Sequence, residues 1–298
     1  MRSKFLPVFQ QSLLLRLEST QAAHHKPTAP SPSPSPSPSP QQQSEERICL
    51  TSTENGIKRI ILNNSKKRNA LSYAMMLELF KEIADMRDRP RVIVISAHGP
   101  VFSSGHDLRE LKKEHGSRRH EEIFRTCTEL MCAVENCEVP VIAQVNGLAA
   151  AAGCQLVASC DLVVASSNST FSVPGVYNGL FCSTPGIPLV RAVPLKIAAK
   201  LLYTGEPITA AEALQHGLVS SVVEEAELEK ETIRLAHRIC QMSPAVIAVG
   251  KKFLRAQVEM DRKLAYQEGE RVMVSNLALS DGQEGIAAFL EKRKAKWS

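Results

Sequence analysis

The chain has 298 residues, of which 44% are hydrophobic and 22% charged, so it is long enough to bury a sizeable core. Its formal net charge is +5, but four bases and one acid in residues 1–40 contribute +3, which leaves only +2 for the rest. Its two basic clusters, 66–68 and 291–297, are too short to form the dense basic stripe of a nucleic-acid-binding domain, so we expect no nucleic-acid partner.

The first 46 residues are predicted to precede the folded core. Residues 1–26 combine four bases and a single acid with Ser, Gln and apolar residues, which is typical of a mitochondrial presequence and predicts import into the matrix. A secretory signal is the alternative, but Gln10 interrupts the apolar run and Arg16 ends it early. Residues 27–46 form a Pro/Ser-rich linker, because repeated prolines fix φ and remove backbone N–H donors.

Strand and helix signals begin at residue 47. Segments 47–53 and 57–63 predict two strands that pair around the turn at Asn55-Gly56. Residues 72–88 follow as a helix with Ser72 as its N-cap. The β-branched run 91–97 suits a buried strand.

The alternation then continues to residue 243. The pattern predicts a helix over 120–137, a strand over 140–146, a short helix over 152–158 and a strand over 161–167. This order indicates an α/β fold. Because no GxGxxG follows the first strand, a dinucleotide-binding Rossmann domain has little support.

Beyond residue 243 the sequence changes character. Segments 244–260 and 263–280 are helical in pattern, and no strand signal accompanies them. We therefore divide the folded part into a core, residues 47–243, and a helical region, residues 244–298. The apolar faces of these helices must be buried against the core or another subunit.

The eight cysteines indicate a reducing compartment. They include no C-x-x-C pair and no zinc-ligand spacing, so we expect no metal site and assign them the role of small buried apolar residues. No apolar run reaches the roughly 18 residues that a membrane span requires, and we predict no span.

Five segments occur in an order and spacing that resemble the enoyl-CoA hydratase/isomerase, or crotonase, superfamily. They are KRNALS (67–72), FSSGHDLREL (102–111), NGLAAAAGCQLVASCDLVVA (146–165), ALQHGLVSSVV (213–223) and EGIAAFLEKRKAKW (284–297). The resemblance implies a crotonase-like spiral of ββα repeats with a C-terminal helical region that mediates trimerisation. It also implies a homotrimer or a dimer of trimers.

The resemblance further implies a coenzyme A thioester as ligand or substrate, with no separate cofactor. Proteins of this family polarise the thioester carbonyl with two backbone N–H groups, which form an oxyanion hole. By motif position these donors are the amides of His106 and Ala152. The resemblance also implies contacts to coenzyme A, which on this sequence fall at Arg68 (or Lys67), Ala70 and Leu71 and, in some members from a neighbouring subunit, at Phe289, Lys292 and Lys296.

Both glutamates that hydratases of this family use as acid and base are replaced at the matching positions. The first position holds Gln155, whose amide does not exchange a proton near neutral pH, and the second holds Gly175. Each such group supplies about 10² to 10⁴ in rate, so ordinary hydration should be almost lost.

Two hypotheses therefore remain open. One is an acyl-CoA-binding protein of fatty acid and lipid metabolism that does not hydrate its ligand. The other is an enzyme with altered acyl-CoA chemistry (isomerase, thioesterase or decarboxylase) that uses the oxyanion hole and an unidentified acid or base. His106 is a candidate for that base because imidazole titrates near neutral pH. The binding motifs survive better than the catalytic ones, which favours the first hypothesis.

Overall fold

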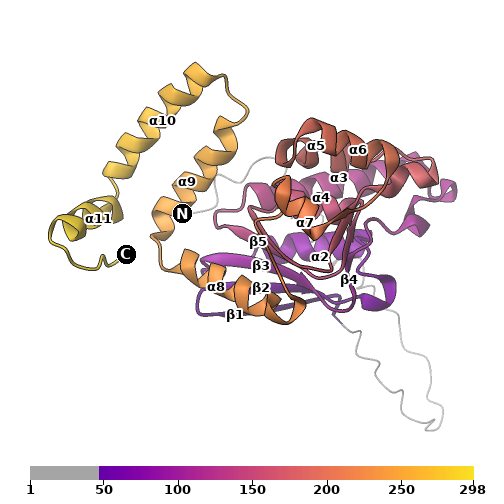
Figure 1. Ribbon diagram of the computed structural model, residues 1–298, viewed down its shortest axis with the longest axis horizontal. Coiled ribbons are helices and arrows are strands. Elements are labelled where there is room, and N and C mark those ends of the chain that lie inside the picture. Colours follow the sequence, from indigo (N-terminus) through magenta and orange to yellow (C-terminus); the bar gives the residue numbers. More distant parts are fainter. Residues whose placement is uncertain (1–46) are drawn as a thin grey trace, which may run out of the picture.

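The computed structural model describes residues 47–298, and the predicted presequence (1–26) and linker (27–46) lie outside the described residues. Figure 1 shows a layered α/β core with a helical arm on one side. The arm consists of the last three helices, which extend away from the sheets.

A six-stranded sheet forms the centre of the core. Its first two strands, β1 and β2, are antiparallel, and the remaining neighbours are parallel. The predicted hairpin is confirmed, since Asn55 (φ 51°) and Gly56 (φ 78°) both adopt the positive φ that a two-residue type I′ turn requires. In spatial order the strands are β1 (Cys49–Glu54), β2 (Ile57–Leu62), β3 (Val92–Ala97), β5 (Val141–Val145), β7 (Leu162–Ser166) and β10 (Ser221–Val223).

A second, smaller sheet was not anticipated from the sequence. Its strands are two or three residues long, too short for an alternating pattern to be recognised. The first three are parallel and the fourth is antiparallel to its neighbour. In spatial order they are β4 (Val101–Ser103), β6 (Leu148–Ala150), β8 (Thr170–Ser172) and β9 (Ile208–Thr209).

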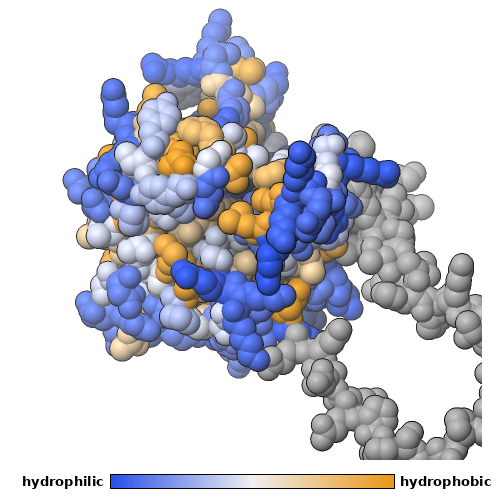
Figure 2. All heavy atoms as spheres, turned by 90° about the vertical axis from the view of Figure 1, so that its right-hand side faces the viewer, coloured by the Kyte–Doolittle hydropathy of each residue, from blue (hydrophilic) through white to orange (hydrophobic). Residues whose placement is uncertain are grey.

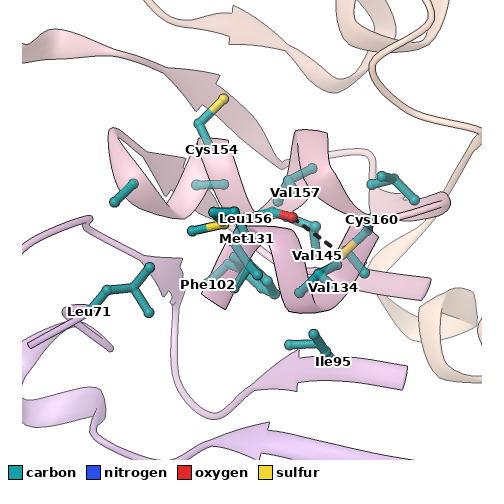
Figure 3. Packing of buried hydrophobic residues seen from close by; sticks show 14 of the residues in the cluster. Leu71, Ile95, Phe102, Met131, Val134, Val145, Cys154, Leu156, Val157 and Cys160 are labelled. Carbon is teal, nitrogen blue, oxygen red and sulfur yellow. Dashed lines mark hydrogen bonds between the residues drawn. The ribbon is translucent and has the colours of Figure 1, made fainter. Parts of the chain in front are cut away.

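Helices cover both faces of the large sheet. On one face α8 packs against β3, β5 and β7, and on the other a larger apolar cluster joins the sheet to α2, α3 and α4. Figure 3 shows the inside of that cluster, where α4 is surrounded by apolar side chains such as Phe102 and Met131. The core helices are α2 (Tyr73–Ala84), α3 (Gly116–Glu135), α4 (Ala152–Ser159), α5 (Ser183–Ala192), α6 (Leu195–Thr204), α7 (Ala210–Gln215) and α8 (Leu228–Cys240).

The predicted helix boundaries are corrected most at the end of α2 and the start of α3, and α3 and the first two helices of the C-terminal region end two or three residues earlier than expected. Ser72 caps α2 as expected, since its hydroxyl accepts a hydrogen bond from Met75 N, but the helix ends at Ala84 rather than at residue 88. The next residue, Asp85, has extended backbone angles. Helix α3 starts at Gly116, four residues before the predicted start, because the polar first turn shows no apolar periodicity.

The C-terminal region is helical as predicted, and no strand follows Ser243 within the described residues. It contains α9 (Pro244–Gln257), α10 (Arg262–Leu277) and α11 (Ser280–Leu290). No residue of α10 is buried, and Tyr266 and Val274 on it are 71% and 67% exposed. This helix therefore presents apolar surface that the described part of the chain does not cover.

The described cysteines are all free thiols, and four of them, Cys49, Cys127, Cys154 and Cys160, are buried as the composition predicted. Cys132 is exposed. Between residues 47 and 298 no three His, Cys, Asp or Glu side chains gather as a metal site would require. In the same range, no helix combines the length and the apolarity needed to cross a membrane.

A buried charged cluster attaches the helical arm to the core. Lys251 on α9 is 7% exposed, and its Nζ donates to the backbone oxygens of Val134 (3.2 Å) and Val139 (2.9 Å). The same Nζ lies 2.6 Å from Asp161 Oδ2, and Arg255 donates to Asp161 Oδ1 at 3.0 Å. Asp161 also accepts the amide of Val141 at 2.8 Å, so one carboxylate links α9 to the start of β5.

Replacing Lys251 by Met should lower the free energy of unfolding by about 2–4 kcal/mol, because two buried carbonyls and part of a buried carboxylate lose their donor. Urea unfolding followed by circular dichroism measures the change. Lys252→Met is the matched control, since Lys252 is exposed on the same helix. Equal effects of the two substitutions would show that the cluster does not anchor the arm.

Candidate functional site

The small sheet brings the two predicted oxyanion-hole residues together. Strand β4 leads to Gly105 and His106, and β6 leads through Ala151 to Ala152 at the start of α4. Because β4 and β6 are parallel neighbours, their carboxyl ends lie at the same edge of the sheet. A Cβ placed on Gly105 would lie 3.1 Å from the nitrogen of Ala152. The two segments are therefore in backbone contact at this edge.

Both predicted donor amides are unpaired. Within residues 47–298, neither the N–H of His106 nor that of Ala152 donates to an acceptor, although the neighbouring amides of Leu71 and Ala151 do. Ala152 is the first residue of α4, and no side chain caps this helix. The positive end of the α4 dipole thus lies at the same edge of the small sheet as the two amides. The arrangement can stabilise a negatively charged oxygen.

Two glycines permit this close approach of backbones. Gly105 has φ +86°, and a Cβ on it would lie 2.7 Å from the Cβ of Ala151. A Cβ on Gly153 would lie 2.6 Å from the backbone oxygen of Ser103. Any side chain at either position would push α4 away from β4 and separate the two donors.

Ala151 holds an unfavourable backbone conformation just before α4. Its φ of +50° and ψ of −118° fall in a region that a residue with a Cβ rarely adopts. Such a conformation costs about 1–3 kcal/mol and persists only where the surrounding structure imposes it. Here the parallel pairing on one side and the start of α4 on the other impose it.

Gln155, at the predicted position of the first glutamate, lies inside the core. Gln155 on α4 is 4% exposed, and its Oε1 is 3.9 Å from the thiol of Cys127 on α3. An amide in this position can donate and accept hydrogen bonds but cannot supply a proton.

The position of the second has no room for a side chain. A Cβ on Gly175 would lie 2.6 Å from the backbone oxygen of Leu180 and 2.7 Å from Cys182 Sγ. The chain turns back on itself here, since Leu180 N donates to Gly175 O at 3.0 Å. A glutamate at this position would therefore require the backbone to move.

The thiols near this region are poor candidates for a replacement nucleophile. Burial raises the pKa of Cys154 to about 12. Burial also raises the pKa of Cys182, although the N–H of Gly175 opposes this. Both groups are protonated at neutral pH, and a thiol reacts as its thiolate.

The residues after β2 that are predicted to contact coenzyme A lie beside the predicted oxyanion hole. Leu71 N donates to Gly105 O at 2.8 Å, and Ser104 N donates to Arg68 O at 3.1 Å, so the 68–71 segment runs alongside the 104–106 segment. The side chain of Leu71 is fully buried, which leaves its backbone for ligand contacts, whereas Arg68 is exposed. Ala70 is 7% exposed.

Asn69 is a positioning residue that the sequence reasoning did not single out. Its side chain donates to the backbone oxygens of His98 (2.9 Å) and Val101 (2.7 Å) and accepts the amide of Asn64 at 2.8 Å. It is fully buried and has φ +49°. An Asn within a predicted ligand-binding motif was the available signal, because Asn tolerates this backbone region and satisfies neighbouring backbone groups.

The C-terminal candidates do not join this group within one chain. Phe289 lies at the end of α11 and is 82% exposed, and Lys292 and Lys296 follow it. Figure 1 shows α11 at the far end of the helical arm, on the opposite side from α2 and α4. Their contact with coenzyme A stays a prediction that requires a neighbouring subunit.

The side chain of His106 is half-buried and contacts Leu71 and Phe124. Its Nδ1 is 3.4 Å from the backbone oxygen of Leu71, and its ring lies edge-on to Phe124 with 5.3 Å between centroids. Burial lowers the pKa of His106, and the hydrogen bond to Leu71 opposes this in part. Its Nε2 is buried and has no hydrogen-bond partner in the described part of the chain.

A family model described as Enoyl-CoA hydratase/isomerase matches residues 52–298, which include every element of this site. The chain belongs to the enoyl-CoA hydratase/isomerase family. The human enoyl-CoA hydratase domain-containing protein 3, mitochondrial, is 57% identical over 258 residues, which cover 86% of this chain and 85% of the human protein. Methylmalonyl-CoA decarboxylase of Escherichia coli strain K12 is 35% identical, covering 81% of this chain and 94% of that enzyme.

A solved structure of the same human protein supports the family fold directly. It superimposes with a TM-score of 0.83 at 55% identity and covers 84% of this chain and 100% of that chain. The predicted α/β crotonase fold with a C-terminal helical region is confirmed, and the structure shows that the fold contains two mixed sheets.

The conformation of Ala151 predicts opposite effects for one substitution at adjacent positions. Ala151→Gly should raise the free energy of unfolding by about 1 kcal/mol, because glycine accepts the positive φ. Ala152→Gly should lower it by about 1 kcal/mol, because a fully buried methyl is lost from a helical residue. Chemical unfolding of the two variants tests this. A loss of stability in both would contradict the strain at Ala151.

The crowding at Gly175 predicts that even a methyl group is poorly tolerated. Gly175→Ala should destabilise the protein by about 1–3 kcal/mol, since the added Cβ meets backbone rather than a mobile side chain. Gly250→Ala is the matched control, because a Cβ there contacts nothing within 4 Å. Differential scanning calorimetry compares the two, and an unchanged melting temperature for Gly175→Ala would show that the loop yields freely.

Proposed function

We propose that this protein binds acyl thioesters of coenzyme A in mitochondria and serves fatty acid and lipid metabolism without ordinary enoyl-CoA hydratase activity. The observation that carries the proposal is the pair of unpaired amides, His106 N–H and Ala152 N–H, at the uncapped start of α4. Membership of a family whose name specifies acyl-CoA chemistry supplies the ligand class.

Two features support thioester binding. A carbonyl oxygen placed between the two amides would satisfy donors that are otherwise without partners. The exposed bases Lys67 and Arg68 lie where phosphate groups of coenzyme A would be attracted.

Absence of hydration is supported by the residues at the two positions where hydratases of this family have glutamates. Gln155 carries an amide, and Gly175 has no side chain and no space for one. Each acid or base increases the rate by about 10² to 10⁴. Without both groups, only the oxyanion hole would still accelerate the reaction.

The name of the 57% identical human relative specifies mitochondria, and the basic, acid-poor segment 1–26 agrees with import. We place the protein in the mitochondrial matrix on these grounds. The boundaries at residues 26, 46 and 243 stay predictions.

Exposed apolar surface supports a closed oligomer. Phe289 and Tyr266 on the helical arm are 82% and 71% exposed, and on α6 Leu195 and Tyr203 are 70% and 71% exposed. The arm and α6 lie on different sides of the molecule in Figure 1, and Figure 2 shows hydrophobic patches on the side that faces away from the arm. Head-to-tail contact between two unlike surfaces generates a ring when the rotation closes, as in a homotrimer or a dimer of trimers.

A second candidate function is altered acyl-CoA chemistry, such as isomerisation, thioester cleavage or decarboxylation. The unpaired Nε2 of His106 favours it, because a buried nitrogen beside an oxyanion hole can act on a bound acyl group. The 35% identical bacterial relative is named as a decarboxylase of an acyl-CoA, which agrees with this possibility.

The purified protein without residues 1–46 should bind crotonyl-CoA but should not hydrate it. Isothermal titration calorimetry measures binding, and the loss of enoyl thioester absorbance measures hydration. Hydration at the rate of an ordinary hydratase would refute the proposal, and so would the absence of binding to every acyl-CoA tested.

Arg68→Gln should weaken binding by several fold, about 1 kcal/mol, because one exposed charge facing a phosphate is removed. Arg238→Gln is the matched control on α8, which packs on the opposite face of the large sheet from α2. Equal affinities for both variants would remove Arg68 from the ligand site.

A further inference from the structure

The imidazole of His106 has one nitrogen that is shielded from solvent and has no hydrogen-bond partner among residues 47–298. Buried polar atoms are nearly always hydrogen-bonded, and an exception calls for an explanation. The Nε2 of His106 is such an exception, and it belongs to the residue whose backbone N–H is one of the two unpaired hole donors.

The protonation of this ring follows from its contacts. The Nδ1 is 3.4 Å from Leu71 O, and a carbonyl oxygen only accepts, so Nδ1 must carry the hydrogen. In the neutral ring Nε2 then presents a lone pair. Burial disfavours the charged imidazolium and lowers the pKa of His106, so the neutral form predominates at pH 7.

The lone pair belongs to the same residue as one of the two predicted oxyanion-hole donors. A thioester oxygen accepting the His106 N–H lies about 3 Å from that nitrogen, which brings the adjoining C1 and C2 atoms of the acyl group next to the same residue. Phe124 packs against the ring and is 39% exposed, so a turn of this surface side chain opens the approach to Nε2.

Lys67 adds positive charge near Asp107, and the carboxylates of Asp107, Glu110 and Glu122 on the neighbouring segments are each hydrogen-bonded. Asp107 lies 2.6 Å from Arg109, and this pairing lowers the pKa of the carboxyl. On α3, Glu122 accepts from Arg119 at 2.8 Å and from the Tyr73 hydroxyl at 2.9 Å.

The carboxylate of Glu110 accepts the amide of Tyr73 at the start of α2, 2.8 Å away. On α4, the polar side chain of the predicted site is the neutral Gln155.

We propose that Nε2 of His106 is the proton acceptor that converts a bound acyl-CoA into its enolate. The C2–H bond breaks, the proton moves to Nε2, and the electron pair forms the C1–C2 double bond while negative charge collects on the thioester oxygen. The N–H groups of His106 and Ala152 hold that oxygen. Return of a proton from the imidazolium to C2 completes the cycle, so the step needs no cofactor or redox partner.

This inference rests on the proposed function, because the thioester must bind at the hole. It assigns one residue two roles, a backbone donor to the oxygen and a side-chain base for the carbon. The substrate class is an acyl-CoA with hydrogen on C2.

The experiment follows hydrogen exchange at C2. Butyryl-CoA is incubated with the protein in D₂O, and mass spectrometry measures deuterium in the acyl group; this ligand has no double bond, so hydration cannot interfere. Wild-type protein should exchange the C2 hydrogens well above the rate without protein. His106→Gln and His106→Phe should reduce the rate at least about 100-fold. Affinity for butyryl-CoA should change less than about threefold, because the backbone donors remain.

Two variants serve as comparisons. His216→Gln removes an imidazole at the C-terminal end of α7, outside the site, and should exchange like the wild type. Glu122→Gln tests the competing base on α3 and should also exchange like the wild type. With a lowered pKa, the wild-type rate should stay level down to about pH 6.5 and fall only below it, as the imidazole becomes protonated.

Each contrary result has a distinct meaning. If butyryl-CoA binds but no exchange occurs, or if both His106 variants exchange at the wild-type rate, the base is refuted and acyl-CoA binding stands. If Glu122→Gln abolishes exchange and His106→Gln does not, Glu122 is the base instead. If no acyl-CoA binds at all, the proposed function itself fails.

Discussion

The site depends on one constraint, the close contact between the segment after β4 and the start of α4. Parallel pairing of β4 with β6 carries both segments to the same edge of the small sheet. Gly105 and Gly153 have no side chains, so the backbones approach to distances that a Cβ would prevent. Two N–H groups and a helix terminus then converge without any polar side chain.

A site made of backbone groups explains how acid and base residues can change while the fold persists. The donors of His106 and Ala152 depend on register and helix position, not on side-chain chemistry. Acid–base chemistry at Gln155 and Gly175, the predicted glutamate positions, would depend on the side chain itself, and the turn at Gly175 leaves no space for one. The close contact between the segment after β4 and the start of α4 also forces Ala151 into a positive φ, which is strained for a residue with a Cβ.

Most of the large sheet could be predicted because its strands are five or six residues long or follow a turn signal such as Asn55-Gly56. The segment 91–97 is a nearly continuous β-branched run, and β3 is buried accordingly. Strands β4, β6 and β8 have three residues each, so no local pattern reveals them, and α5 to α8 were also not predicted. Strands β4, β6 and β8 pair with one another through contacts between segments some 20 to 50 residues apart in the sequence.

The sequence alone determined the family through five motifs in register, the change to a helical region after Ser243, and the chemical identity of Gln155 and Gly175. These are properties of residue type and order, which a linear chain displays directly. The tertiary structure decided that Gly175 is enclosed and that, within residues 47–298, the neighbouring amides of His106 and Ala152 and the Nε2 of His106 have no partner. Those facts depend on which atoms meet across the fold, and no spacing along the chain records them.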